Sequence, residues 1–205
     1  MLQLKNGPKT SSIFSVWVVI NALLFSLFMV GFMYGYLDKF LVDETYITHV
    51  IIGVTFFFIM RSGDTAFVLG KRYKTIDEQI KRYQNSFAKG NADTHKEVMV
   101  EALRSNLSLY RFAGSFLVGL GLLGTVYGIS IAFSEVNPDV IADADASTEV
   151  MAVLLSGLAT AFHTTLAGIV GMLWNMINLY LLNEETSRYY SYVISGEQDN
   201  VTQSL

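Results

Sequence analysis

Long uncharged stretches alternate with shorter polar segments along this chain. Residues 13–37 are uncharged over 25 positions, residues 112–133 over 22 and residues 150–182 over 33. A helix that crosses a bilayer needs about 20 apolar residues, because each residue advances the helix by about 1.5 Å. The pattern predicts three membrane-spanning helices in these ranges.

A fourth, shorter apolar stretch lies between the first two of these. Residues 46–60 give only 15 uncharged positions, so the segment is either a short span extended past Arg61 and Asp64 through "TAFVLG", or a re-entrant segment. We favour the span. The fold class predicted is an all-α integral membrane protein with four transmembrane helices. The first apolar run is also too long for a cleavable signal peptide and lacks a small-residue cleavage pattern.

The polar insert at residues 61–111 alternates charged with apolar positions, and "KGNAD" at residues 89–93 interrupts the pattern. This arrangement predicts two amphipathic helices joined by a turn, which continue the second and third spans outside the membrane. At about 50 residues the insert is too short to form a catalytic domain with its own core.

The distribution of positive charge predicts the orientation. The N-terminal tail and residues 61–111 together hold 12 of the 14 Lys and Arg residues, whereas residues 134–149 carry five carboxylates and no cation. Basic loops remain on the cytoplasmic side. Four spans with both termini in the cytoplasm follow, and the chain divides into residues 1–60 (tail and first two spans), 61–111 (cytoplasmic helical insert), 112–182 (last two spans) and 183–205 (cytoplasmic tail).

Composition excludes several kinds of chemistry. The chain has 52% hydrophobic and 16% charged residues, no cysteine and three scattered histidines, so disulfides, thiolate chemistry and a zinc site are not expected. No phosphate-binding loop or nucleophile elbow appears. We therefore expect no enzyme activity, no cofactor, no bound metal and no nucleic-acid partner, and the lipid bilayer is the environment.

Each of the last two predicted spans has one face of small residues and one of bulky residues. At about 100° per residue, Gly121, Thr125 and Gly128 share a face of the third span, and Gly157, Thr160, Thr164 and Gly168 share a face of the fourth. Small residues let helix backbones approach closely in lipid. We expect close helix packing at five glycines: Gly121, Gly124, Gly128, Gly157 and Gly168.

Hydroxyl groups accompany these glycines, and they have two interpretations. In the first, the hydroxyls only join helices and are bonded back to carbonyls one turn earlier. In the second, they mark a solute path, as polar groups at membrane depth often do. The candidate residues for an ion path or a partner-facing surface are Thr125, Thr160, Thr164, Thr165 and His163. His163 could either bond a neighbouring helix or titrate beside a water-filled path.

A cation path of this kind lacks one component. Threonine hydroxyls cannot hold a proton reversibly near neutral pH, and a titratable carboxylate usually performs that step. The last two spans contain no Asp or Glu. Either the chain conducts nothing, or a partner helix supplies the carboxylate.

Two segments carry a resemblance to a known family. "GLGLLGTVYGISIAF" (residues 119–133) and, after the acidic loop, "GLATAFHTTLAGIVG" (residues 157–171) resemble the paired membrane signature of the MotA/TolQ/ExbB proton-channel family. The four-span layout is nearer to the MotA branch than to the three-span TolQ and ExbB branch. Residues 112–182 are the region that the resemblance covers well.

The resemblance implies an ion-driven stator in the bacterial inner membrane. Five copies would form a ring around two copies of a MotB/TolR/ExbD-like single-span partner, and flow of H⁺ or Na⁺ past the partner's aspartate would drive rotation and mechanical work. By motif position, Thr125 matches the "GTV" threonine and Thr165 the threonine of the fourth-span motif. Both would face the partner's aspartate.

The chain departs from the family's pattern in three places. Thr160 stands where TolQ and ExbB carry a glutamate, so the choice between H⁺ and Na⁺ stays open. The insert is much shorter than in flagellar members, and the long cytoplasmic tail of defence-system relatives is missing. The driven machinery is therefore unassigned.

Two other classes of function remain open. The chain could be a self-sufficient channel or small-solute transporter, although it lacks intramembrane carboxylates and a detectable inverted repeat. It could also be a non-conducting membrane scaffold whose small residues only assemble a complex. An intramembrane enzyme is the weakest alternative, because no catalytic constellation is visible.

Overall fold

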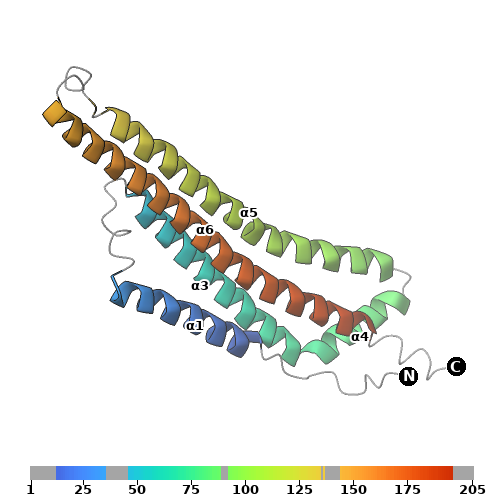
Figure 1. Cartoon of the computed structure of the whole chain (residues 1–205). Helices are drawn as coiled ribbons and strands as arrows, with labels where there is room; N and C mark the ends of the chain where they lie inside the picture. Colours follow the sequence, from blue (N-terminus) through green and yellow to red (C-terminus); the bar gives the residue numbers. More distant parts are fainter. Residues whose placement is uncertain (1–12, 36–45, 89–91, 135, 137–143, 196–205) are drawn as a thin grey trace. The chain divides into compact units, whose positions relative to one another are not determined.

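The computed structural model describes residues 13–35, 46–88, 92–134, 136 and 144–195, and within these ranges all regular structure is α-helical. The helices are α1 (Ile13–Met33), α3 (Ile47–Lys74), α4 (Ile76–Ala88), α5 (Ala92–Ser134) and α6 (Ala144–Ser195). Figure 1 shows α3, α5 and α6 as long, uninterrupted helices.

Among the described residues, four helices or helix segments are long and apolar enough to cross a membrane: Ile13–Met33, Ile47–Lys74, Leu107–Ser134 and Val150–Val193. The short apolar stretch at residues 46–60 thus belongs to a continuous helix of 28 residues. A re-entrant segment would need a break in this helix, so the span is the interpretation that fits. The chain is a multi-pass membrane protein.

The polar insert differs from its prediction in one detail. Helix α5 runs without interruption from Ala92 into the third span, as expected. Helix α3, however, ends at Lys74, and α4 begins at Ile76. Thr75 lies between them and accepts backbone hydrogen bonds from Glu78 (3.1 Å) and Gln79 (3.2 Å). The Thr75 hydroxyl donates to the Arg72 carbonyl at 3.2 Å, so the backbone carbonyl of Thr75, and not its side chain, accepts the first hydrogen bonds of α4.

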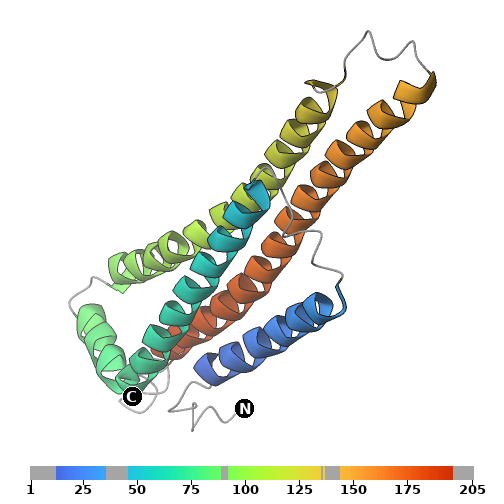
Figure 2. The ribbon, with the colours of Figure 1, turned by 90° about the vertical axis from the view of Figure 1, so that its left-hand side faces the viewer.

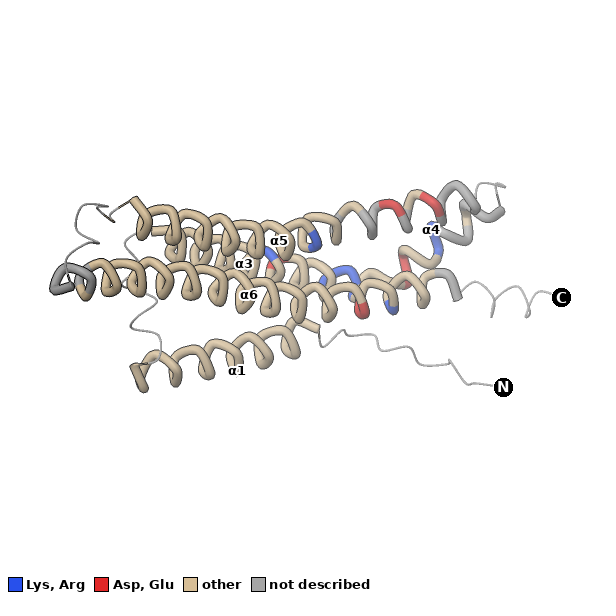
Figure 3. Tube along the Cα trace, turned by 45° about the horizontal axis from the view of Figure 1, so that its top comes forward, with Lys and Arg blue, Asp and Glu red and all other residues tan. Residues whose placement is uncertain are grey.

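The chain forms two compact units. The first unit comprises Met1–Ala22, Ile59–Arg111 and Ile177–Leu205, and the second comprises Leu23–Phe58 and Phe112–Met176. The described charged side chains lie in the segments of the first unit, whereas the α3, α5 and α6 segments 47–58, 112–134 and 150–176 of the second contain no Asp, Glu, Lys or Arg (Figure 3).

In the first unit, polar side chains join α1 to α3 and α6. The Trp17 indole donates to the Ser62 hydroxyl at 2.9 Å. The amides of Asn21 and Asn178 exchange two hydrogen bonds, at 2.9 and 3.2 Å. Both asparagines are buried. A reciprocal amide pair satisfies polar groups that would otherwise face hydrocarbon.

Aromatic side chains join α3 to α5 and α6 in the same unit. The Tyr110 hydroxyl donates to the carbonyl of Arg61 at 3.0 Å and shares a 2.7 Å hydrogen bond with Thr65. The rings of Tyr73 and Tyr189 meet edge to face at 5.1 Å between centroids. Leu107 and Leu182 of the same unit are buried.

Candidate functional site

The site residues predicted from the sequence lie in the second unit, where α5 and α6 run side by side (Figures 1 and 2). The two helices approach so closely because glycine stands at the contact on both sides. A Cβ atom added to Gly168 would lie 2.7 Å from the carbonyl oxygen of Leu117, and one added to Gly121 would lie 3.1 Å from that of Thr164.

The other three glycines lie at the same contact. A Cβ atom added to Gly128 would lie 3.1 Å from the carbonyl oxygen of Gly157. One added to Gly157 would lie 2.8 Å from the carbonyl oxygen of Gly128. At Gly124 an added Cβ would overlap the side chain of Thr164. Gly121, Gly124, Gly128, Gly157 and Gly168 therefore all bring α5 and α6 together, as small residues do in lipid.

This close approach brings two threonines together. The hydroxyls of Thr125 on α5 and Thr165 on α6 are hydrogen-bonded to each other. The Thr125 hydroxyl oxygen also lies 3.1 Å from the carbonyl oxygen of Gly121 and 3.2 Å from that of Ala161. The Thr165 hydroxyl oxygen lies 3.1 Å from the Ala161 carbonyl oxygen and 3.4 Å from that of Gly121. We call these four oxygens, from Thr125, Thr165, Gly121 and Ala161, the threonine cluster.

The threonine cluster has more acceptors than donors. Each hydroxyl has one proton to donate, and each oxygen can accept. Two protons are therefore shared among several oxygen acceptors, and no Asp, Glu, Lys or Arg stands in the surrounding segments of α5 and α6. The cluster is neutral and hydrogen-bonding, which suits contact with a cation or with a carboxylate.

The remaining candidates have different surroundings. Thr164 is fully buried and donates to the Ala161 carbonyl at 3.0 Å, so its side chain fills the helix contact against Gly124. Thr125, Thr165, Thr160 and His163 are each partly exposed on this chain. Neighbouring residues point about 100° apart on a helix, and this separates Thr164 from Thr165.

Helix α3 contributes a residue that the sequence analysis did not single out. Thr55 is buried and donates to the Ile51 carbonyl at 2.8 Å. An added Cβ on Gly171 would lie 2.5 Å from the Thr55 hydroxyl oxygen, so this hydroxyl rests directly on α6. Asn175 on α6 is also buried. In the sequence, Thr55 and Asn175 could have been noticed only as polar residues within uncharged runs.

The bulky faces of both helices point away from the contact. Phe116, Leu123 and Tyr127 on α5 are well exposed on this chain, and so are Leu155, Phe162 and Leu173 on α6. In a membrane protein such surfaces meet lipid or other subunits. The polar and small side chains thus occupy one side of each helix and the large apolar ones the other.

Comparison with known proteins agrees with this arrangement. The family model described as the MotA/TolQ/ExbB proton channel family matches residues 69–191. This range includes α5 and α6 through both membrane segments, together with all five glycines and the threonine cluster. Comparisons with curated proteins and with solved structures found no match. With the family model matching more than half of its residues, the chain belongs to the MotA/TolQ/ExbB proton channel family.

Proposed function

We propose that this chain is the ring-forming subunit of an ion-driven stator, which conducts H⁺ or Na⁺ only together with a single-span partner that carries a carboxylate. The observation that carries the proposal is the threonine cluster: partly exposed hydroxyls at a close helix contact, in membrane segments without any carboxylate of their own. Family membership supports a proton-channel function of this general kind.

The hydroxyls of the threonine cluster suggest how such a subunit would treat the partner's carboxylate. An ionised carboxylate accepts stronger hydrogen bonds than a backbone carbonyl does, so Thr125 and Thr165 would turn their protons towards it. Once the carboxylate is protonated or bound to Na⁺, it accepts weaker hydrogen bonds. The hydroxyls then donate again to the carbonyls of Gly121 and Ala161. The partner is then released to move to the next subunit.

The proposal includes an arrangement in the membrane. Both termini and the polar residues 61–111 face the cytoplasm of a bacterial inner membrane, because these segments hold most of the cations. By analogy with the family, five copies surround two copies of the partner. Thr160, Thr165 and Thr125 line the central path, with His163 nearby. Thr164 supports the path through helix packing.

Reconstitution into liposomes tests this function. The chain with its single-span partner should carry H⁺ or Na⁺, and Thr165→Val should abolish this flux while the oligomer still assembles. Thr165→Ser, which retains the hydroxyl, should keep the flux. Tyr127→Phe is the matched control, since it removes a hydroxyl from the exposed opposite face of α5. Unchanged flux in Thr165→Val would exclude this ion path.

A scaffold function is the second candidate, and one observation favours it: both hydroxyls of the threonine cluster are already bonded within the chain. A scaffold predicts that Thr125→Val changes stability and never changes ion movement. Liposomes that hold this chain without a partner address the self-sufficient channel, because conductance there would show that the chain carries the whole path itself.

A further inference from the structure

The first unit contains a cavity of about 180 Å³ between α3, α5 and α6. Its polar lining residues are Arg61, Asp64, Thr65, Arg72, Thr186 and Tyr190, and its apolar ones are Val68, Leu69 and Leu107. Metabolite-sized ligands occupy pockets of roughly 300 Å³ or more. The cavity therefore suits a small group, such as a single phosphate, better than a nucleotide.

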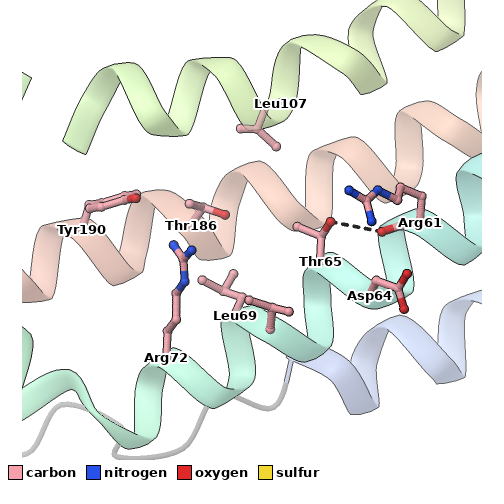
Figure 4. Close-up of a pocket in the computed structure, with 9 residues that line it drawn as sticks. Arg61, Asp64, Thr65, Leu69, Arg72, Leu107, Thr186 and Tyr190 are labelled. Atoms are coloured by element: carbon pink, nitrogen blue, oxygen red, sulfur yellow. Dashed lines mark hydrogen bonds between the residues drawn. The ribbon is translucent and has the colours of Figure 1, made fainter. Parts of the chain in front are cut away.

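The cations of this cavity have no carboxylate partner among the described residues. Arg188 forms an ion pair with Glu184, and this pair involves neither Arg61 nor Arg72. Figure 4 shows the guanidinium of Arg72 directed towards Thr186 and Tyr190 of α6. The Thr186 hydroxyl donates its one proton to the Leu182 carbonyl at 2.5 Å. Two donor groups, the Arg72 guanidinium and the Tyr190 hydroxyl, therefore converge here from two helices.

The opposite end of the cavity is less favourable for an anion. Asp64 lies one helical turn after Arg61, and Figure 4 shows its carboxylate directed away from Arg72. The Thr65 hydroxyl is engaged with the Arg61 carbonyl at 3.1 Å and with Tyr110. A negative ligand is therefore attracted most strongly to the Arg72 end, where no lining carboxylate competes.

The cavity also lies directly after an apolar surface. Arg61 directly follows Met60 of the same unit, whose side chain is strongly exposed. Val68 and Leu69 continue an apolar wall beside the arginines. A ligand that combines a phosphate with an acyl chain matches both surfaces, and basic pockets between membrane helices do bind lipid head groups.

We propose that this cavity binds a phosphate group through Arg72 and Tyr190, and that the phosphate belongs to an anionic phospholipid. Guanidinium groups recognise phosphate through two parallel hydrogen bonds. This site is separate from the proposed ion path, because none of its lining residues belongs to the threonine cluster.

Native mass spectrometry of the full-length protein in detergent tests the site. Phosphatidylglycerol should remain bound, whereas phosphatidylcholine should not. Arg72→Gln should weaken phosphatidylglycerol binding at least fivefold, and Arg72→Lys should weaken it less. Asp64→Asn should not weaken it. Lys74→Gln is the matched control, since it removes the same charge from the end of α3 outside the cavity.

Three further outcomes decide the proposal. If inorganic phosphate competes with phosphatidylglycerol in wild type and loses its effect in Arg72→Gln, recognition of a phosphate group by Arg72 is supported. If the protein retains inorganic phosphate and not the lipid, the natural ligand is a free anion and the lipid assignment is wrong. Equal retention of phosphatidylglycerol by wild type, Arg72→Gln and Lys74→Gln would overturn the site. Elution of each variant as the wild-type oligomer verifies folding.

Discussion

Thr125 and Thr165 come from different helices, 40 positions apart in the sequence, and their hydroxyls are hydrogen-bonded to each other beside the carbonyls of Gly121 and Ala161. Each threonine thus reaches the carbonyl one turn earlier on its own helix and the corresponding carbonyl of its neighbour. The glycines of the helix contact make this exchange possible, since side chains larger than hydrogen there would force α5 and α6 apart.

The two hydroxyls should be energetically coupled. We predict that the double variant Thr125→Val/Thr165→Val is destabilised by less than the sum of the two single variants. Either single change already removes the shared hydrogen bond, so the second change cannot remove it again. A coupling of about 0.6–1.7 kcal/mol is expected from hydrogen bonds between membrane helices. Unfolding in mixed micelles measures it, and additive effects would contradict the shared hydrogen bond.

Gly168→Ala should destabilise the helix contact. The added methyl group would lie 2.7 Å from the backbone oxygen of Leu117, which cannot move without shifting α5. Overpacking of this kind costs about 1–3 kcal/mol. Gly119→Ala is the control, because nothing lies within 4 Å of its added Cβ. Thermal unfolding in detergent should separate the two variants, and equal melting temperatures would contradict the close contact.

Gly63→Ala should disturb the packing of α1 on α3. Its added Cβ would lie 2.8 Å from the Trp17 ring, which also stacks near Phe14 and donates to Ser62. We expect a loss of about 1–3 kcal/mol of stability. In a Trp17→Leu background the same change should cost little, because the ring is gone. Gly70→Ala, with open space around its added Cβ, should leave stability unchanged in both backgrounds.

The amide pair of Asn21 and Asn178 gives a further test. Asn21→Leu leaves the Asn178 amide without its partner on α1, and a loss of about 1–2 kcal/mol is expected for a hydrogen bond between membrane helices. The double change to leucine should recover part of the loss, because no amide then remains unmatched. Ser26→Ala, at an exposed position of α1, is the control. A double variant that is less stable than either single variant would contradict this account.

The predictability of the fold follows from the physics of each element. The spans could be predicted because lipid requires long uncharged helices, and the α5–α6 glycines because small residues recur at helical spacing. The end of α3 at Lys74 was not predicted, since the charged and apolar pattern continues through Thr75 without a strong break. The helical extent of α6 to Ser195 also exceeds the apolar run that marked its span.

The details of the site depended on tertiary contacts that periodicity does not contain. The sequence placed Thr164 on the small face of α6 with Gly157 and Gly168. It could not predict the hydrogen bond between Thr125 and Thr165, because that bond depends on the axial register of α6 against α5. The Arg72 cavity and the pairing of Asn21 with Asn178 likewise join segments far apart in the chain. Local spacing has no information about such pairs.

The reciprocal amide pair has a consequence for biogenesis. Asn178 is made 157 residues after Asn21, a delay of roughly 10–30 s at ordinary rates of synthesis. During this interval the Asn21 amide can bond to the Trp17 carbonyl of its own helix, as it does at 2.9 Å. Helix α1 therefore enters the bilayer before α6 exists, and its polar contact with α6 forms only when the last helix has been inserted.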